Sequence, residues 1–220
     1  MKILELKNVN FTYDKSKYVL KDINISFETG KTYGIFGKSG AGKYTLLSLM
    51  AGLESCKEGT ILYKDEDLNK INFDTYRSND IGIIFQSYNL LPHLTALENV
   101  ILSMDISKYK HENKKEKALE FLERVGIDAE KANRRVLQLS GGEQQRIAIA
   151  RALSYNANII LADEPTGNLD RETEDEILNI LKEIAHKDKK CVIIISHSMH
   201  VKEEVDKVYN LVKGKIEINK

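Results

Sequence analysis

The chain has 220 residues, long enough for a substantial hydrophobic core, and its 33 basic and 33 acidic residues balance. This balance argues against nucleic acid as the main partner, because nucleic-acid-binding proteins carry excess positive charge. The start, Met1–Lys7, alternates charged and apolar residues unlike a signal peptide, and no apolar run approaches the roughly 20 residues that cross a bilayer. We therefore expect a cytosolic protein, with Cys56 and Cys191 as reduced core thiols, that reaches a membrane only through a partner.

The N-terminal part of the chain has the alternating pattern of half-buried strands. The segments Ile3–Leu6, Val19–Ile25 and Thr60–Tyr63 predict antiparallel strands. Lys31–Phe36 is a more continuous apolar run and predicts a short buried strand. Downstream, Leu46, Leu47, Met50 and Leu53 recur at helical spacing.

A glycine-rich loop joins this buried strand to this helix. Its residues satisfy the pattern G-x-x-x-x-G-K and are Gly37, Lys38, Ser39, Gly40, Ala41, Gly42 and Lys43. Glycines allow successive backbone N–H groups to turn toward one anion, and a helix N-terminus adds further N–H groups. We expect Lys43 to lie against the β- and γ-phosphates of a nucleotide. A plain glycine turn between core elements is the alternative, which the lysine and the flanking elements disfavour.

Tyr44 departs from this pattern, because the next position normally carries the Ser or Thr whose hydroxyl binds Mg²⁺. A phenol on a rigid ring cannot place its oxygen where a short side chain does. We expect the ring to lie either across the phosphate pocket or out in a neighbouring space. Thr45 follows directly, but its side chain should point elsewhere on the helix.

The middle of the chain is helical in character. Thr95–Glu98 is a capping box that precedes an apolar-patterned segment. Lys114–Val125 predicts a helix, and Gly126 is suited to end it. The charged run His111–Lys117 predicts a solvated helix start. The apolar face of the predicted helix comprises Ala118, Phe121, Leu122 and Val125.

The last third alternates strands with a helix. Asn158–Ala162 and Cys191–Ser196 are buried runs, and between them an apolar stripe predicts a helix. This order predicts an α/β fold with a parallel sheet covered on both faces. The residues of the stripe are Ile177, Ile180, Leu181 and Ile184.

Two adjacent carboxylates end the first of these strands. Asp163 and Glu164 would lie at the carboxyl edge of the sheet, where ligand sites of α/β proteins form. Asp163 would hold Mg²⁺, and Glu164 would orient the water that attacks the γ-phosphate. Acids at a strand end are often merely solvated, but the preceding phosphate loop favours a metal and base site.

The segment Leu139–Arg146 contains a second predicted anion site. Ser140 and two glycines, Gly141 and Gly142, precede a predicted helix that starts at Glu143, so a hydroxyl and free N–H groups face a phosphate. This string resembles the signature motif of the ATP-binding cassette (ABC) family, although Ser140 alone could simply cap a helix. The resemblance implies that these four residues complete the ATP site of an opposite subunit, and hence a homodimer that forms on ATP binding.

Other positions match the family in order. Tyr13 resembles the aromatic residue that stacks on adenine, Thr45 the residue that contacts the α-phosphate, and Gln86 the glutamine that senses Mg²⁺ and the attacking water. Gly167–Asp170 resembles the loop that crosses the dimer interface, and His197 the histidine that contacts the γ-phosphate. Without the other motifs, Tyr13 would be an ordinary strand tyrosine, Gln86 a loop glutamine and Gly167–Asp170 a plain turn. Only His197 among the five histidines follows a buried strand, and we expect the others on the surface.

The resemblance covers essentially the whole chain and implies the ABC ATPase fold: a P-loop NTPase core with a mixed sheet, an N-terminal antiparallel β subdomain and an inserted helical subdomain. We expect a single domain, with residues 1–86 and 157–220 forming the core and 87–156 the helical subdomain. Leu90–Val100 and Ala162–Asp170 are similar to ATPases of lipoprotein release, macrolide export and antimicrobial-peptide efflux. A cell-division ATPase shares these strings.

Three functions are compatible with these motifs. The leading one is an ATPase that uses ATP and Mg²⁺ to drive an integral-membrane permease from the cytoplasmic face, with hydrolysis impaired by Tyr44. The second is an ATP-gated clamp or regulator in which Tyr44 has removed efficient turnover. The third is a soluble ABC protein acting on ribosomes or DNA. It expects tandem cassettes or a long coiled-coil insertion, and the sequence shows neither.

Overall fold

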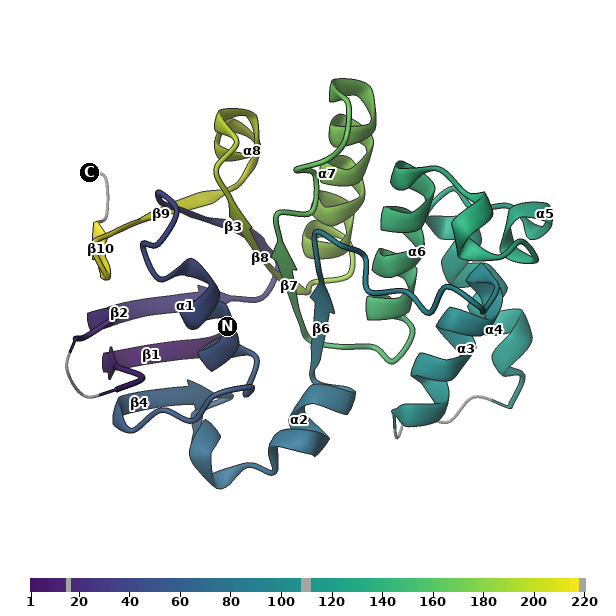
Figure 1. Cartoon of the computed structure of the whole chain (residues 1–220). Coiled ribbons are helices and arrows are strands. Elements are labelled where there is room, and N and C mark those ends of the chain that lie inside the picture. Colours follow the sequence, from purple (N-terminus) through teal and green to yellow (C-terminus); the bar gives the residue numbers. More distant parts are fainter. Residues whose placement is uncertain (15–16, 108–111, 218–220) are drawn as a thin grey trace.

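The computed structural model describes residues 1–14, 17–107 and 112–217, which form two sheets with flanking helices (Figure 1). The first sheet is antiparallel, with the order β2-β1-β4-β5. The predicted antiparallel strands of the N-terminal part are thus confirmed, because β1 pairs with β2 on one side and β4 on the other. The strands are β1 (Lys2–Phe11), β2 (Leu20–Glu28), β4 (Glu58–Tyr63) and β5 (Glu66–Asp67).

The second sheet has six strands in the order β10-β9-β3-β8-β7-β6. Neighbouring strands from β9 to β6 run parallel, and β10 is antiparallel to β9, so the sheet is mixed. The carboxyl ends of the parallel strands therefore meet at one edge. The strands are β3 (Lys31–Phe36), β6 (Ile81–Ile84), β7 (Ile159–Asp163), β8 (Cys191–Ser196), β9 (Lys207–Val212) and β10 (Lys215–Glu217).

The central strands divide their side chains between two hydrophobic clusters. In β8, Cys191, Ile193 and Ile195 belong to the cluster shared with the antiparallel sheet, whereas Val192 and Ile194 belong to the opposite one. Alternate residues of a strand point to opposite faces, so a run without polar interruptions indicates burial on both. The strand Cys191–Ser196 and its two covered faces are confirmed.

Helix α1 (Lys43–Met50) packs between the two sheets, with Leu46 and Leu47 fully buried. The sequence pattern places Leu53 on this helix as well, and this prediction is wrong. The helix ends at Met50, and Gly52 adopts φ +63, a conformation that terminates helices. Leu53 is consequently 47% exposed.

Four helices lie together beside the six-stranded sheet (Figure 1). The capping box at Thr95 is present, and Gly126 adopts φ +79 after the end of α4, as predicted. Their shared core includes Val100, Leu122 and Ile147. The charged run before α4 is described from residue 112 onward, so His111 lies outside the described residues. The helices are α3 (Ala96–Ile106), α4 (Lys114–Arg124), α5 (Ala129–Ala132) and α6 (Gly141–Leu153).

The remaining helices complete the layers. The predicted stripe of α7 is confirmed for Ile177, Leu181 and Ile184, which are buried, while Ile180 is partly covered. Cys56 and Cys191 are buried and unpaired, as predicted. No helix of the described part of the chain is long and apolar enough to span a membrane. These elements are α2 (Phe73–Asn79), α7 (Arg171–His186), α8 (Met199–Glu204) and the 3₁₀ turns η1 (Leu68–Lys70) and η2 (Val136–Gln138).

Candidate functional site

The glycine-rich loop connects the end of β3 to the start of α1. Gly42 precedes the helix at φ +103, and no side chain caps the first turn. The N–H groups at this helix start are therefore free of side-chain caps and suited to an anion. Gly37 is equally constrained, because a Cβ there would lie 2.4 Å from the carbonyl oxygen of Leu211 in β9.

Lys43 spans this loop from the first turn of α1. Its Nζ donates to the carbonyl oxygen of Gly37 at 2.6 Å and lies 3.4 Å from that of Lys38. The ammonium thus links the start of the helix to the first residues of the loop. A phosphate in the loop would offer it a charged acceptor, which forms a stronger hydrogen bond than a carbonyl does.

A cavity of about 350 Å³ unites the loop with the two carboxylates. Asp163 is the last residue of β7, and Glu164 follows it. Burial raises the pKa of Asp163, the charge of Glu164 adds to this, and Lys43 opposes it. A cation beside Asp163 would favour its ionised form. The lining residues are Val19, Ser39, Gly40, Gly42, Lys43, Tyr44, Thr45, Asp163 and Glu164.

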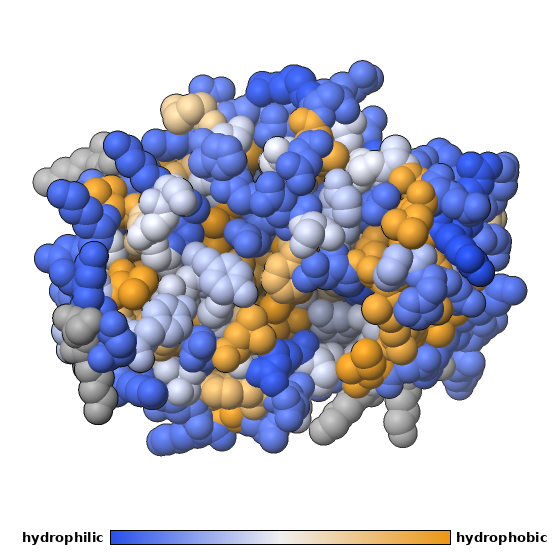
Figure 2. Space-filling model, viewed as in Figure 1, coloured by the Kyte–Doolittle hydropathy of each residue, from blue (hydrophilic) through white to orange (hydrophobic). Residues whose placement is uncertain are grey.

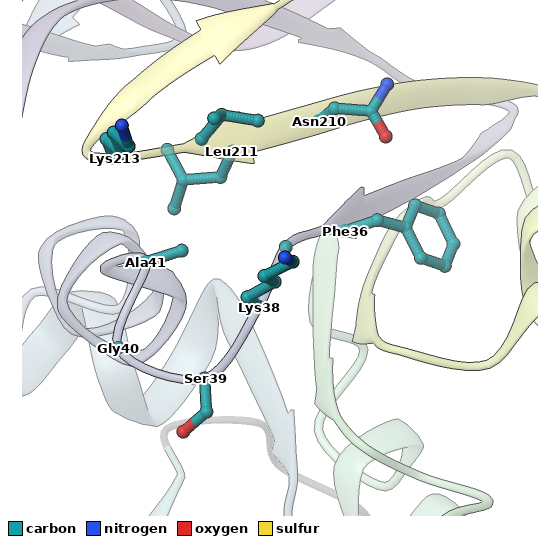
Figure 3. Close-up of a pocket in the computed structure, with 10 residues that line it drawn as sticks. Phe36, Lys38, Ser39, Gly40, Ala41, Asn210, Leu211 and Lys213 are labelled. Atoms are coloured by element: carbon teal, nitrogen blue, oxygen red, sulfur yellow. The ribbon is translucent and has the colours of Figure 1, made fainter.

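A second cavity, of about 440 Å³, lies on the other side of the loop, against the end of β9 (Figure 3). Phe36, Ala41 and Leu211 contribute apolar walls, and its lining contains no acidic residue. Lys43 and both carboxylates line the smaller cavity and not this one.

Tyr44 lines the smaller cavity while its side chain lies mostly in solvent, 59% exposed. Thr45 behaves differently, since it is buried and its Oγ1 lies 3.2 Å from the hydroxyl of Tyr13. Tyr13 is 62% exposed and packs edge-on against Phe11, with ring centroids 4.9 Å apart. The structure therefore brings Tyr13 to the phosphate loop, close to its helix.

Glu164 and His197 form a pair. The Nδ1 of His197 lies 2.8 Å from Oε1 of Glu164, and Ser196 donates its hydroxyl to Oε2 at 3.1 Å. Glu164 adopts φ +46, which is uncommon for a non-glycine residue, and its N–H donates to the carbonyl of Ile195 at 2.8 Å. The sequence indicated both residues separately, but neither their contact nor Ser196 was predicted.

Gln86 lies two residues beyond β6 and is exposed. Its Nε2 is 3.5 Å from Oδ1 of Asn168, and a Cβ on Gly167 would come within 3.0 Å of the same nitrogen. Gln86 does not line the cavity that holds Lys43. The structure thus brings it to the Gly167–Asp170 loop rather than to the phosphate loop.

Ser140 caps α6, and its capping box is complete. Its Oγ accepts from the N–H of Glu143 at 3.3 Å, and the Glu143 carboxylate accepts from the N–H of Ser140 at 2.8 Å. This bond, together with Lys131 at 3.0 Å, lowers the pKa of Glu143 to about 2. Gly142 must be small, because a Cβ there would lie 2.5 Å from Cγ2 of Thr173. None of these residues lines the cavity around Lys43.

Two features of the site escaped the sequence analysis. Arg151 of α6 donates to the carbonyls of Tyr88 and Asn89, and thereby ties α6 to the loop that follows Gln86. His200 was expected on the surface, and the structure shows it half-buried, with its side chain 9% exposed. The described histidines His93 and His186 are exposed, as predicted. No cluster of three or more His, Cys, Asp or Glu suited to a metal occurs in the described residues.

Comparison with known proteins identifies the family. The family model described as "ABC transporter" matches residues 20–167. The chain belongs to the ABC transporter ATPases. An uncharacterized ABC transporter ATP-binding protein of Bacillus subtilis, YclH, is 45% identical over 97% of this chain and 95% of its own length. The lipoprotein-releasing system ATP-binding protein LolD of Treponema denticola is 42% identical, over 94% of this chain and 93% of its own.

Solved structures agree with this membership. The dimeric structure of the ABC transporter cassette MJ0796, from Methanocaldococcus jannaschii, has a TM-score of 0.88 at 37% identity and covers 98% of this chain and 97% of that one. A dimeric post-hydrolysis state of the same cassette, bound to ADP and Pi, also has a TM-score of 0.88, at 36% identity and with the same coverage. The ABC ATPase fold predicted from the motifs is confirmed, and the chain is an ABC ATPase.

Proposed function

We propose that this ABC ATPase is the ATP-hydrolysing subunit of an integral-membrane permease complex and closes as a homodimer on ATP. The single observation that carries the proposal is the cavity of about 350 Å³ in which Lys43, Asp163 and Glu164 converge on the phosphate loop. A second anion-binding helix start, at Ser140, lies outside this cavity. One chain therefore offers two half-sites, which a second copy would complete.

The roles of the residues follow from their chemistry. The amides of Gly37–Gly42 and the ammonium of Lys43 would hold the phosphates, and Tyr13 would stack on adenine. Glu164 would accept the proton of the attacking water, while His197 donates from Nδ1 and fixes the orientation of the carboxylate. Ser140, Gly141, Gly142 and Glu143 would present their helix start to the nucleotide of the partner.

The residues present fit Mg²⁺ only in part. Asp163 supplies a carboxylate, whose raised pKa a cation would lower, but Tyr44 has no compact hydroxyl. The amide of Gln86 is directed to Asn168, so Gln86 would need to move to reach the cation. When bound, the cation would neutralise charge that develops on the phosphates. We propose that Asp163 holds it and that Tyr44 weakens its binding and slows hydrolysis.

The permease partner is supported by relatives and by the surface. LolD is a lipoprotein-releasing system protein, which favours a lipophilic or peptide substrate and a location on the cytoplasmic face of the membrane. Apolar residues gather over α3 and α6 in Figure 2. In this part of the molecule Leu102, Ile106 and Leu137 are exposed. We propose that residues 87–156 form the helical subdomain with this face, while 1–86 and 157–220 form the core.

Tyr44 favours one alternative, a hydrolysis-defective clamp or regulator, including a role in cell division. In that case ATP would close the dimer without release of phosphate. The two functions differ in turnover, so one set of variants separates them.

The test compares Mg-ATPase activity and ATP-induced dimerisation of the chain, Tyr44→Ser and Tyr44→Phe. We expect Tyr44→Ser to raise kcat by about tenfold or more, since it restores a short hydroxyl ligand. Tyr44→Phe should match the unmodified chain, because the phenol is not a useful ligand. Equal rates for the chain and Tyr44→Ser would contradict the proposed impairment. Dimerisation without turnover would favour the clamp.

A further inference from the structure

Two loops at the carboxyl edge of the sheet carry the Glu164–His197 pair. The loop from β7 to α7 holds Glu164, and the loop from β8 to α8 holds His197. Their side chains touch at 2.8 Å, yet each loop leads into a different helix. Figure 1 shows both helices, α7 and α8, at this edge of the sheet, so contacts between them bear on the geometry of the pair.

An inner link runs through Glu174 in the first turn of α7. One oxygen, Oε1, accepts from Thr166 Oγ1 at 3.0 Å and from Ser198 Oγ at 3.2 Å. Thr166 lies two residues after Glu164, and Ser198 directly follows His197. The side chain of Glu174 is only 13% exposed and Thr166 only 5%, so water competes little for these bonds.

An outer link runs through His200 of α8. Its Nδ1 lies 2.6 Å from a guanidinium nitrogen of Arg171, and its Nε2 contacts Asp175 Oδ1. A guanidinium can only donate, so Nδ1 accepts, and Nε2–H donates to the carboxylate. His200 thus joins the first and fifth residues of α7, immediately after the Gly167–Asp170 loop.

We propose that Glu174 and His200 are positioning residues that hold the Glu164–His197 pair together by fastening α8 to the start of α7. This inference rests on the roles proposed for Glu164 and His197. Val201, the residue after His200, is fully buried and packs α8 into the core. Neither link touches the cavity around Lys43, so nucleotide binding should not depend on them.

The test uses paired variants of the full chain, each also made with Tyr44→Ser so that turnover is measurable. His200→Leu and Glu174→Ala remove the links. His200→Gln keeps an acceptor for Arg171 and a donor for Asp175, and Glu174→Gln keeps the shared acceptor. The control is His186→Leu, on the same helix α7, which removes a histidine that pairs with Asp206 at 2.8 Å.

We expect His200→Leu and Glu174→Ala to lower kcat about tenfold, since small displacements of reacting groups are costly, with KM within about twofold. Amide hydrogen exchange should accelerate in both loops, at residues 164–171 and 196–200. The Gln variants should restore both readouts, and His186→Leu should change neither.

The proposal would be overturned if kcat were unchanged in His200→Leu and Glu174→Ala, or if faster amide exchange were confined to α8. It would also be overturned if the Gln variants behaved like His200→Leu and Glu174→Ala. A failure of the proposed function has a different signature, because neither the chain nor Tyr44→Ser would then hydrolyse ATP. Even then, amide hydrogen exchange at residues 164–171 and 196–200 would decide whether Glu174 and His200 hold the two loops together.

Discussion

At the scale of single residues, the site depends on backbone positions that neighbouring elements enforce. Gly37 lies so close to Leu211 of β9 that no side chain fits, and Glu164 is held in a left-handed conformation beside Ile195 of β8. Such a conformation costs about 1–3 kcal/mol and persists only where the surroundings enforce it. The phosphate loop and the proposed base are thus fixed by the strands on either side of them.

Gly37→Ala should therefore destabilise the protein and weaken nucleotide binding. The added Cβ meets a strand carbonyl, which has little freedom to move, so we expect a loss of about 1–3 kcal/mol in the free energy of unfolding. Chemical denaturation and titration with a fluorescent ATP analogue measure the two effects. Ser39→Ala, in the same loop, adds no atom and should leave stability within about 0.5 kcal/mol. A Gly37→Ala protein as stable as the parent would contradict the close packing of this loop.

At the scale of elements, α3 and α6 begin with the same device. Thr95 and Ser140 each complete a capping box with a glutamate three residues later. The capping box stabilises both helices, but only α6 begins with two glycines, Gly141 and Gly142, directly after its capping residue. A shared motif thus has a structural role at α3 and, in our proposal, an added ligand role at α6.

Ser140→Ala and Thr95→Ala should separate these roles. Each removes one cap and should lower the free energy of unfolding by about 1 kcal/mol. Only Ser140→Ala should also weaken ATP-induced dimerisation, since its hydroxyl would face the nucleotide of the partner. Size-exclusion chromatography with light scattering measures the dimer, and an equal loss for both variants would contradict the added role of Ser140.

Glu143 adds a dependence on pH at the same helix. Its pKa falls to about 2 in the folded protein because the N–H of Ser140 and the ammonium of Lys131 favour the carboxylate. A depressed carboxyl pKa contributes stability above the unfolded value of about 4.3, and this is lost as pH falls toward 2. Glu143→Gln should therefore be less stable than the parent at pH 7, and the difference should shrink between about pH 4.3 and 2. Denaturation at a series of pH values checks this, and a constant difference would refute the charge contribution.

At the scale of the molecule, the parallel sheet gathers residues from distant parts of the sequence. Lys43 follows β3, Asp163 ends β7 and His197 follows β8, and these three strands are adjacent. The helix start at Ser140 lies outside the cavity around Lys43. The separation of Ser140 from this cavity supports an ATP site that is completed only when two chains meet.

Glu164→Gln should consequently trap the dimer. In the Tyr44→Ser background, where turnover is measurable, hydrolysis should fall by about 100-fold or more because the amide cannot accept the proton of the attacking water, while ATP still binds. We expect a dimer that persists with ATP and dissociates when ATP is removed, as seen by light scattering. A monomer at saturating ATP would argue against the proposed dimer site.

Much of this fold and site could be predicted from the amino-acid sequence, because the strongest signals in the sequence are local. The alternation of β1, β2 and β4, the two-sided burial of β8 and the capping box of α3 depend on residues close together in the chain. The phosphate loop, the acidic pair and the signature string also lie within short segments, and together they indicated the ABC ATPase fold. The end of α1 was missed, because Leu53 has the helical spacing but follows a glycine with positive φ.

The contacts among these residues could not be predicted from the sequence, because they depend on how the chain folds in space. The contact of Glu164 with His197, the approach of Tyr13 to Thr45 and the contact of His200 with Asp175 join positions at least 25 residues apart. Chain spacing carries no information about such distances, which depend on the strand order and on how α7 and α8 pack. The direction of the Tyr44 ring was likewise open in the sequence, where two orientations were compatible with the loop. The structure places Tyr44 at the rim of the cavity around Lys43, with the residue 59% exposed.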